Sequence, residues 1–280
     1  MTFSIKRIAS AAALAFGLVG GASALPSVTN AFVIGTNTFS DDFIEFLADK
    51  DSSGSITVGD VLLTSVKITS FPLSGTPVNT VNEFTVFSAI RVTTVTTVPN
   101  IACATGATLP GGCAVFEFAS TTEGLAFWLG GFGFASSLPT TADSVGVFFE
   151  DATPDFTLAN FATGLDGTAR IVVDLVGANG DSWSATGPKD LGDFTLNASG
   201  KGLGSFSATT TISSQGFAGW NLGPGMTVRG NLSPQSGAAS PVGGDATFET
   251  TATRLPEPAS LALVGAALLG VGVSARRRKN

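Results

Sequence analysis

The sequence predicts an all-β protein, either an antiparallel β-sandwich or a jelly roll, because three observations agree. Short segments rich in Val, Ile, Thr and Phe recur along the chain, and several alternate apolar with small polar residues. Clusters of Gly, Pro, Asn or Asp separate these segments, as turns require. No long helical period lies between them. Many short strands at close spacing are typical of sandwiches and jelly rolls.

About eleven segments fit this description of a strand. In chain order they are ITVGDVLLTSVKITSF (56–71), EFTVFSAIRVTTVTTV (83–98), CAVFEFAS (113–120), LAFWLGGFGFAS (125–136), SVGVFFED (144–151), FTLANFA (156–162), ARIVVDLVGA (169–178), DFTLNASG (193–200), GSFSATTTIS (204–213), MTVRGNL (226–232) and ATFETTAT (246–253). The segment DDFIEFLA (41–48) fits either a helix or a strand. No repeat of fixed period is evident, which disfavours a solenoid.

Residues 1–24 are predicted to be a helical secretory signal peptide. Lys6 and Arg7 precede an apolar stretch over 8–19, and the small residues that follow include the A-x-A site that ends at Ala24. A positively charged N-terminal region, a short apolar stretch and a cleavage site of small residues define a signal peptide, so we expect cleavage after Ala24.

Residues 255–280 predict a membrane-targeting tail. The triplet Pro256, Glu257 and Pro258 opposes a helix upstream, and the uncharged apolar run 259–275 follows it. As a helix this run is roughly 25 Å long, just enough to serve as a transmembrane helix. It is followed at once by four cations, which predict a cytoplasmic flank and a body on the opposite side of the membrane. These cations are Arg276, Arg277, Arg278 and Lys279.

This order of features resembles the PEP-CTERM sorting signal of exopolysaccharide-producing Gram-negative bacteria. The matching residues are the Pro-Glu-Pro triplet at 256–258, the apolar run and the terminal Arg cluster. The resemblance implies that the tail holds the protein in the inner membrane until an exosortase processes it. The body would then lie on the periplasmic side first, and later at the cell surface or in the extracellular matrix.

The body between the two ends, residues 25–254, is acidic. It holds 8 of the 14 Lys and Arg residues and 20 of the 21 Asp and Glu residues, so its net charge is near −12. Binding of nucleic acid needs clustered cations, so this function is not expected. An acidic body suits an extracellular protein that holds divalent cations.

Cys103 and Cys113 are the two cysteines of the chain. In an exported protein such a pair favours a disulfide, here one that closes a small loop rich in Gly. A soft metal site is disfavoured because the chain has no His and no third Cys to complete it.

The segment DKDSSGSITVGD (49–60) has the spacing of a twelve-residue calcium loop. Gly54 takes the position of the tight turn, which lets alternate residues point towards one ion. The predicted oxygen ligands are Asp49, Asp51, Ser53, the backbone carbonyl of Ser55, Thr57 and Asp60. The loop resembles those of EF-hand and dockerin proteins, but position 12 is Asp, and a strand is expected after it instead of a helix. The alternative is a hydrophilic turn without metal.

An enzyme is not expected, because the absence of His removes the usual Ser-His-Asp and Cys-His machinery. A carboxylate pair of the glycosidase kind would remain, with candidates at Glu117, Glu123, Glu150, Asp151 and Asp155. Trp183 and Trp220 stand in Gly-rich surroundings and are candidates for stacking on a sugar ring.

The sequence therefore predicts an exported structural or adhesive protein of the cell surface or exopolysaccharide matrix, with one structural Ca²⁺. Two alternatives stay open at this point. The first is a carbohydrate-binding module, which requires an exposed Trp183 or Trp220. The second is a carbohydrate-active enzyme, which requires two carboxyl groups at a suitable distance in a cleft.

Overall fold

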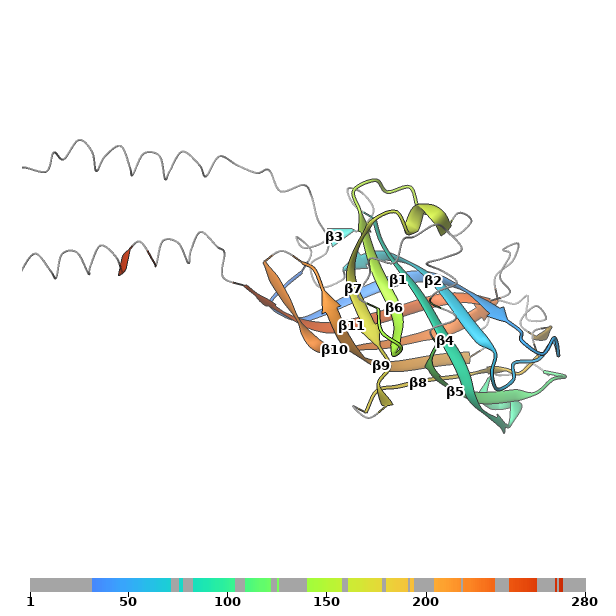
Figure 1. Ribbon diagram of the computed structural model, residues 1–280. Coiled ribbons are helices and arrows are strands. Elements are labelled where there is room, and N and C mark those ends of the chain that lie inside the picture. Colours follow the sequence, from blue (N-terminus) through green and yellow to red (C-terminus); the bar gives the residue numbers. More distant parts are fainter. Residues whose placement is uncertain are drawn as a thin grey trace, which may run out of the picture.

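The structure, a computed structural model, is an all-β body (Figure 1). It describes residues 32–71, 76–77, 83–103, 109–121, 125, 140–157, 161–177, 180–190, 192–193, 204–217, 219–234, 242–255, 265 and 267–268. The predicted signal peptide lies outside these residues, as does the predicted transmembrane helix apart from three positions. No helix within the described residues is both long and apolar enough to cross a membrane.

The described residues of the body form eleven strands. They are β1 (Gly35–Ala48), β2 (Val61–Phe71), β3 (Thr76–Pro77), β4 (Glu83–Val98), β5 (Cys113–Ser120), β6 (Ser144–Asp151), β7 (Thr168–Asp174), β8 (Ser182–Pro188), β9 (Gly204–Gln215), β10 (Trp220–Pro234) and β11 (Val242–Arg254). Short 3-10 turns lie at Asn100–Ala102 and Phe161–Gly164.

The strands form one antiparallel sheet that closes on itself. Its order is β3-β2-β1-β11-β10-β9-β7-β6-β4-β5-β8, and β2 also pairs with β4. This last pairing completes a ring of eight strands: β2, β1, β11, β10, β9, β7, β6 and β4. The first and last long strands, β1 and β11, are neighbours over eleven residue pairs, from Gly35 opposite Ala252 to Glu45 opposite Val242.

The ring branches at β4 and at β9. One edge of β4 pairs with β6 over 83–88 and then with β5 over 90–98. The matching edge of β9 pairs with β7 over 211–215 and with β8 over 205–209. Because β5 also pairs with β8, these two strands continue the wall of the barrel beyond β6 and β7.

The prediction of a sandwich or jelly roll was therefore wrong in its architecture, although the all-β class and the antiparallel pairing are confirmed. The observed fold is a closed barrel-like sheet. Alternating apolar and polar residues give a strand one buried and one exposed face, and this holds equally in sandwiches and barrels. The pairing of β1 with β11 brings the two ends of the body together and makes the fold a barrel instead of a sandwich. No pattern in the local sequence of either strand indicates this pairing.

Eight of the predicted segments are strands, namely those in β2, β4, β5, β6, β7, β9, β10 and β11. The segment over 41–48 is strand, as part of β1. The predicted strand over 156–162 is absent; an isolated bridge residue and a 3-10 turn occupy its described part. The segment over 125–136 lies outside the described residues except Leu125, and the segment over 193–200 except Asp193.

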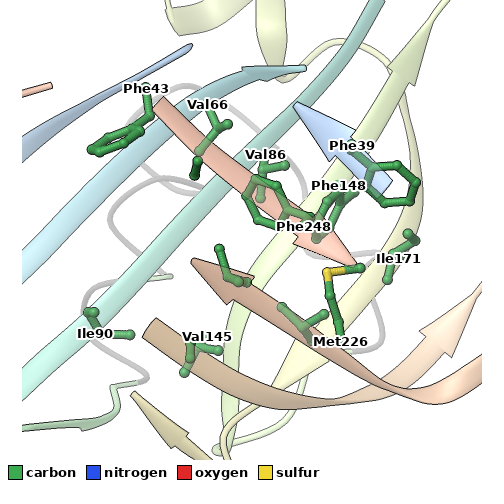
Figure 2. Packing of buried hydrophobic residues seen from close by; sticks show 14 of the residues in the cluster. Phe39, Phe43, Val66, Val86, Ile90, Val145, Phe148, Ile171, Met226 and Phe248 are labelled. Atoms are coloured by element: carbon green, nitrogen blue, oxygen red, sulfur yellow. The ribbon is translucent and has the colours of Figure 1, made fainter. Parts of the chain in front are cut away.

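The core inside the barrel consists of aromatic and aliphatic side chains (Figure 2). Phe148 packs edge-on against Phe248 with ring centroids 5.6 Å apart, and Phe84 lies 5.6 Å from Phe148. A second apolar cluster covers the outer face of β4 and β6, where Phe87 packs against Phe149 and Phe156. Both faces of β6 are therefore buried, which explains its nearly continuous apolar sequence.

Candidate functional site

The acidic loop over 49–60 lies between β1 and β2 at one end of the barrel. A strand leads into it and another leaves it directly after Asp60, as predicted for its exit. Gly54 and Gly59 have φ of 74° and 103°, and Ser52 also has positive φ at 57°. Because L-residues with side chains rarely adopt such values, the two glycines allow the chain to reverse sharply here.

The loop brings three of the predicted carboxylate ligands together. Asp49, Asp51 and Asp60 each place an oxygen within 4.8 Å of the others. The Thr57 hydroxyl donates to Asp51 at 3.0 Å and to Asp60 at 3.1 Å. Four of the predicted ligands therefore converge on one small volume, and all four offer the hard oxygen atoms that Ca²⁺ prefers.

Backbone amides fix the orientation of these carboxylates. The Asp49 carboxylate accepts from the N–H groups of Ser53 at 3.2 Å and Gly54 at 2.9 Å. Asp60 is fully buried and accepts from the N–H groups of Lys50 at 2.8 Å and Thr57 at 2.7 Å. Hydrogen bonds from Ser53 and then Thr57 lower the pKa of Asp51.

The two predicted serine ligands have other contacts. The Ser53 hydroxyl donates to the Ser55 carbonyl at 3.0 Å, and that carbonyl is the oxygen predicted as a ligand. The Ser55 hydroxyl donates to the Asp190 carboxylate instead of turning towards the loop. In addition, the Ile56 N–H donates to the Lys189 carbonyl at 2.7 Å. The loop is therefore held against residues 189–190, which follow β8.

The predicted disulfide between Cys103 and Cys113 is present and lies beside the same segment. The Gly111 N–H donates to the Asp193 carboxylate at 2.9 Å, and the Lys189 N–H donates to the Gly112 carbonyl at 3.0 Å. The disulfide loop and the acidic loop therefore contact opposite sides of one short connection.

The two candidate Trp residues are half-buried and lie on different strands. Trp183 is half-buried in β8, opposite Ala208, and lines the interior of the barrel. Trp220 is half-buried at the start of β10, with its ring 5.8 Å from Phe32 and 5.9 Å from the Arg254 guanidinium. Both tryptophans pack against the core. The pair of exposed rings that would support a sugar-stacking platform is not formed by these side chains.

Two of the five candidates for a catalytic carboxylate pair, Asp151 and Asp155, lie close together. Glu117 is exposed on β5, and Glu123 lies outside the described residues. Glu150 is buried and forms an ion pair of 2.7 Å with Arg170. Asp151 and Asp155 lie close together, and Asp166, which the sequence did not single out, joins them.

Sequence analysis missed two carboxyl groups inside the barrel, Asp41 and Glu45 on β1. Both line a small interior cavity of about 30 Å³, together with apolar side chains such as Phe43 and Val66. Burial raises the pKa of Asp41 to about 8 and that of Glu45 to about 7. A signal was present in the sequence, because a strand over 35–48 puts both carboxyls on the same face as Phe43.

The tail is the part of the chain that comparison with known proteins identifies. Residues 255–279 match the family model described as the PEP-CTERM protein-sorting motif. The chain carries this motif. The match contains all the predicted sorting residues, which lie outside the described residues: Pro256, Glu257, Pro258, Arg276, Arg277 and Arg278.

The PEP-CTERM motif makes this a protein that an exosortase sorts to the cell surface, through a membrane-anchored stage. The exosortase is therefore its processing partner. Comparison with curated proteins and with solved structures gives no match. The PEP-CTERM motif thus defines the destination of the protein, while the role of the barrel depends on its own geometry.

Proposed function

We propose that the barrel is a non-catalytic adhesive and structural component of the cell surface or exopolysaccharide matrix of a Gram-negative bacterium. Before processing, the tail would hold it in the inner membrane with the body on the periplasmic side. The observation that carries the adhesive role is the outer face of four neighbouring strands, β1, β11, β10 and β9, which is rich in hydroxyl groups.

Along these strands, exposed and buried residues alternate, so every second side chain points outward. One row across the face runs from Thr38 through Glu249 and Thr227 to Thr209. The next row runs from Ser40 through Thr247 and Arg229 to Ser207. Neighbouring strands are about 4.8 Å apart, so the face offers a lattice of hydrogen-bonding groups at close, regular spacing.

Such a face suits a polysaccharide better than a small sugar. Each hydroxyl both donates and accepts, as sugar hydroxyls do, and each contact is weak because water competes for it. A long glycan makes many of these contacts at once, and the combined effect gives useful affinity. The closed sheet supports this role because it keeps the face rigid.

Calcium is the second part of the proposal. The acidic loop would hold one Ca²⁺ with Asp49, Asp51, Asp60 and Thr57, whose oxygens already converge. Extracellular calcium modules have dissociation constants of about 10⁻⁴ to 10⁻³ M, so the ion would have a structural role. It would stiffen the end of the barrel where the loop contacts residues 189–190.

Co-sedimentation of the full-length protein with exopolysaccharide from the native host tests the adhesive role. The variant Thr209→Ala/Thr227→Ala/Thr247→Ala removes three hydroxyls from the proposed face, and we expect it to bind several-fold more weakly. The matched control is Thr94→Ala/Thr96→Ala/Thr97→Ala, which removes three exposed hydroxyls from β4. Equal binding by the wild type and both variants, or no binding by the wild type, would refute the proposal.

The host must also be compared with and without its exosortase. We expect the body at the cell surface without its tail in the wild type, and a membrane-bound full-length protein in the deletion strain. If the body reaches the surface in both strains, exosortase processing is not required for its function.

A further inference from the structure

The end of the barrel where β1 starts and β11 ends carries exposed apolar side chains. Ile34 directly precedes β1 and is 73% exposed, and Leu255 directly follows β11 and is 46% exposed. Gly35 lies opposite Ala252 in the pairing of these strands, so Ile34 and Leu255 flank the ends of two neighbouring strands. From here β1 runs to the acidic loop at the other end of the barrel (Figure 1).

An aromatic ring and a cation lie beside these two residues. Trp220, the first residue of β10, is half-buried and lies opposite Arg254, the exposed last residue of β11. The Arg254 guanidinium is 5.9 Å from the centre of the Trp220 ring, which also packs against Phe32. Trp is enriched at membrane–water interfaces, and Arg binds phosphate groups. We call Ile34, Trp220, Arg254 and Leu255 the terminal patch.

The charge of the terminal patch favours contact with phosphate. Arg254 is the one charged residue in the three described segments that form this end of the barrel, 32–37, 219–225 and 250–255. The three clustered aspartates at the ends of β6 and β7 lie on the opposite side of the ring from β11. A surface that carries lipid phosphates is therefore attracted to the side of the barrel formed by β1, β10 and β11.

The length of the chain after the barrel limits how far the terminal patch can lie from the membrane. The Leu255 N–H donates to the Gly219 carbonyl at 2.8 Å, so the barrel holds the chain up to the start of the PEP-CTERM motif. Only residues 256–258 separate Leu255 from Ala259, the first residue of the apolar run. An extended chain spans at most about 3.6 Å per residue, so Leu255 lies within about 14 Å of Ala259.

We propose that the terminal patch docks on the phospholipid surface of the inner membrane before the tail is processed. The inference rests on the proposed anchoring of the tail in that membrane. Lipid head groups extend about 5 to 8 Å beyond the hydrocarbon core, so an anchored tail brings the patch to the bilayer surface. There Ile34 and Leu255 lose exposed apolar surface, and Arg254 binds a lipid phosphate.

Processing by the exosortase reverses this contact. While the tail is anchored, docking is an intramolecular event at high effective concentration, so a small patch is sufficient. Cleavage removes the tether, and the patch alone holds the barrel too weakly to keep it on the membrane.

Fluorescence quenching tests the contact in vesicles of phosphatidylethanolamine and phosphatidylglycerol that contain the full-length protein. Ile34→Cys and Val58→Cys each place one thiol for an NBD label at an exposed apolar position, while Cys103 and Cys113 stay in their disulfide. We expect lipids with a nitroxide on the head group to quench the label at position 34 several-fold. The label at position 58 should be unaffected, because the 14 residues of β1 put it about 46 Å away.

Arg254→Glu separates docking from tethering, because it leaves the tail intact but places a negative charge against the phosphates. It should reduce quenching at position 34 several-fold, whereas Arg91→Glu, the same change at an exposed arginine of β4, should not. Flotation of the vesicles measures anchoring separately.

The outcomes distinguish anchoring from docking. A protein that does not float with the vesicles refutes the anchoring and this inference together. A protein that floats refutes docking alone if position 34 is not quenched, if position 58 is quenched equally, or if Arg254→Glu has no effect. Quenching that appears only after exosortase is added would assign the terminal patch to that enzyme and overturn docking on lipid.

Discussion

The Asp41 carboxyl accepts a hydrogen bond from the Ala246 N–H at 2.5 Å inside the barrel, and its second oxygen, Oδ2, has no hydrogen-bond partner. The two residues lie opposite each other in the pairing that joins the first long strand to the last. The β1–β11 pairing that closes the sheet therefore also contains a buried carboxyl group with a hydrogen-bond partner for only one of its two oxygens.

The burial of the Asp41 carboxyl predicts that the protein loses stability as the pH rises. Burial raises the pKa of folded Asp41 from 3.8 to about 8. The unfolded chain therefore releases this proton near pH 4, while the folded protein keeps it until about pH 8. Its contribution to the free energy of unfolding is complete below pH 4 and is lost between pH 4 and 8, with a magnitude on the order of 5 kcal/mol.

Asp41→Asn checks this contribution, because it keeps the shape and the acceptor oxygen but has no proton to release. Urea unfolding from pH 4 to pH 8 should show a flatter decline for Asp41→Asn than for the wild type. Asp143→Asn, at an exposed position, should decline as the wild type does. Parallel curves for all three proteins would mean that Asp41 is already ionised in the folded state.

Asp60 and Asp51 should respond differently to mutation, although both are predicted calcium ligands. Asp60 is buried and accepts two backbone N–H bonds, so Asp60→Ala leaves buried donors without partners. We expect it to lower the free energy of unfolding by about 3 kcal/mol even with a chelator present. Asp51 is exposed, so Asp51→Ala should have little effect without Ca²⁺.

Thermal unfolding with EGTA and with CaCl₂ separates the two roles. Asp51→Ala should lose the stabilisation that Ca²⁺ gives at the acidic loop while keeping the melting temperature of the chelated wild type. Destabilisation of Asp51→Ala in EGTA would instead show that this residue, too, is mainly structural.

Gly244 is predicted to tolerate no side chain. A Cβ atom there would lie 2.0 Å from the Asn231 carbonyl oxygen and 2.9 Å from the Phe43 ring. Gly244→Ala should therefore push β10 and β11 apart and destabilise the protein by about 2 to 3 kcal/mol in urea unfolding. Gly177→Ala, where no atom lies within 4 Å, should change stability by less than about 0.5 kcal/mol. Similar midpoints for the two variants would contradict this packing.

The strands could be predicted from the sequence where alternation and turn residues were clear, as in the segments of β4 and β11. β8 was missed because its sequence, SWSATGP, is short and contains Gly and Pro. The closed ring could not be predicted, because its closing contacts join residues such as Asp41 and Ala246 that are far apart in the chain.

The acidic loop was predictable because its ligands lie within twelve residues, and a local spacing rule covers them all. The cluster of Asp151, Asp155 and Asp166 was not predictable, because Asp166 lies in a different turn from the other two and meets them only when Gly167 packs on β6. Spacing along the sequence does not predict a cluster whose members come from separate segments of the chain.

The disulfide is predicted to stabilise the end of the barrel that carries the acidic loop. Closing the loop from Cys103 to Cys113 restricts the unfolded chain and contributes about 2.5 to 3 kcal/mol. Cys103→Ala/Cys113→Ala should therefore unfold at lower urea concentration than the oxidised wild type. Because Gly112 accepts from the Lys189 N–H, and Lys189 in turn accepts from the Ile56 N–H, hydrogen exchange at Ile56 should also become faster. A reducing agent should bring the wild type to the midpoint of the variant and leave the variant unchanged. If reduction does not shift the wild-type midpoint, the disulfide makes no contribution to stability.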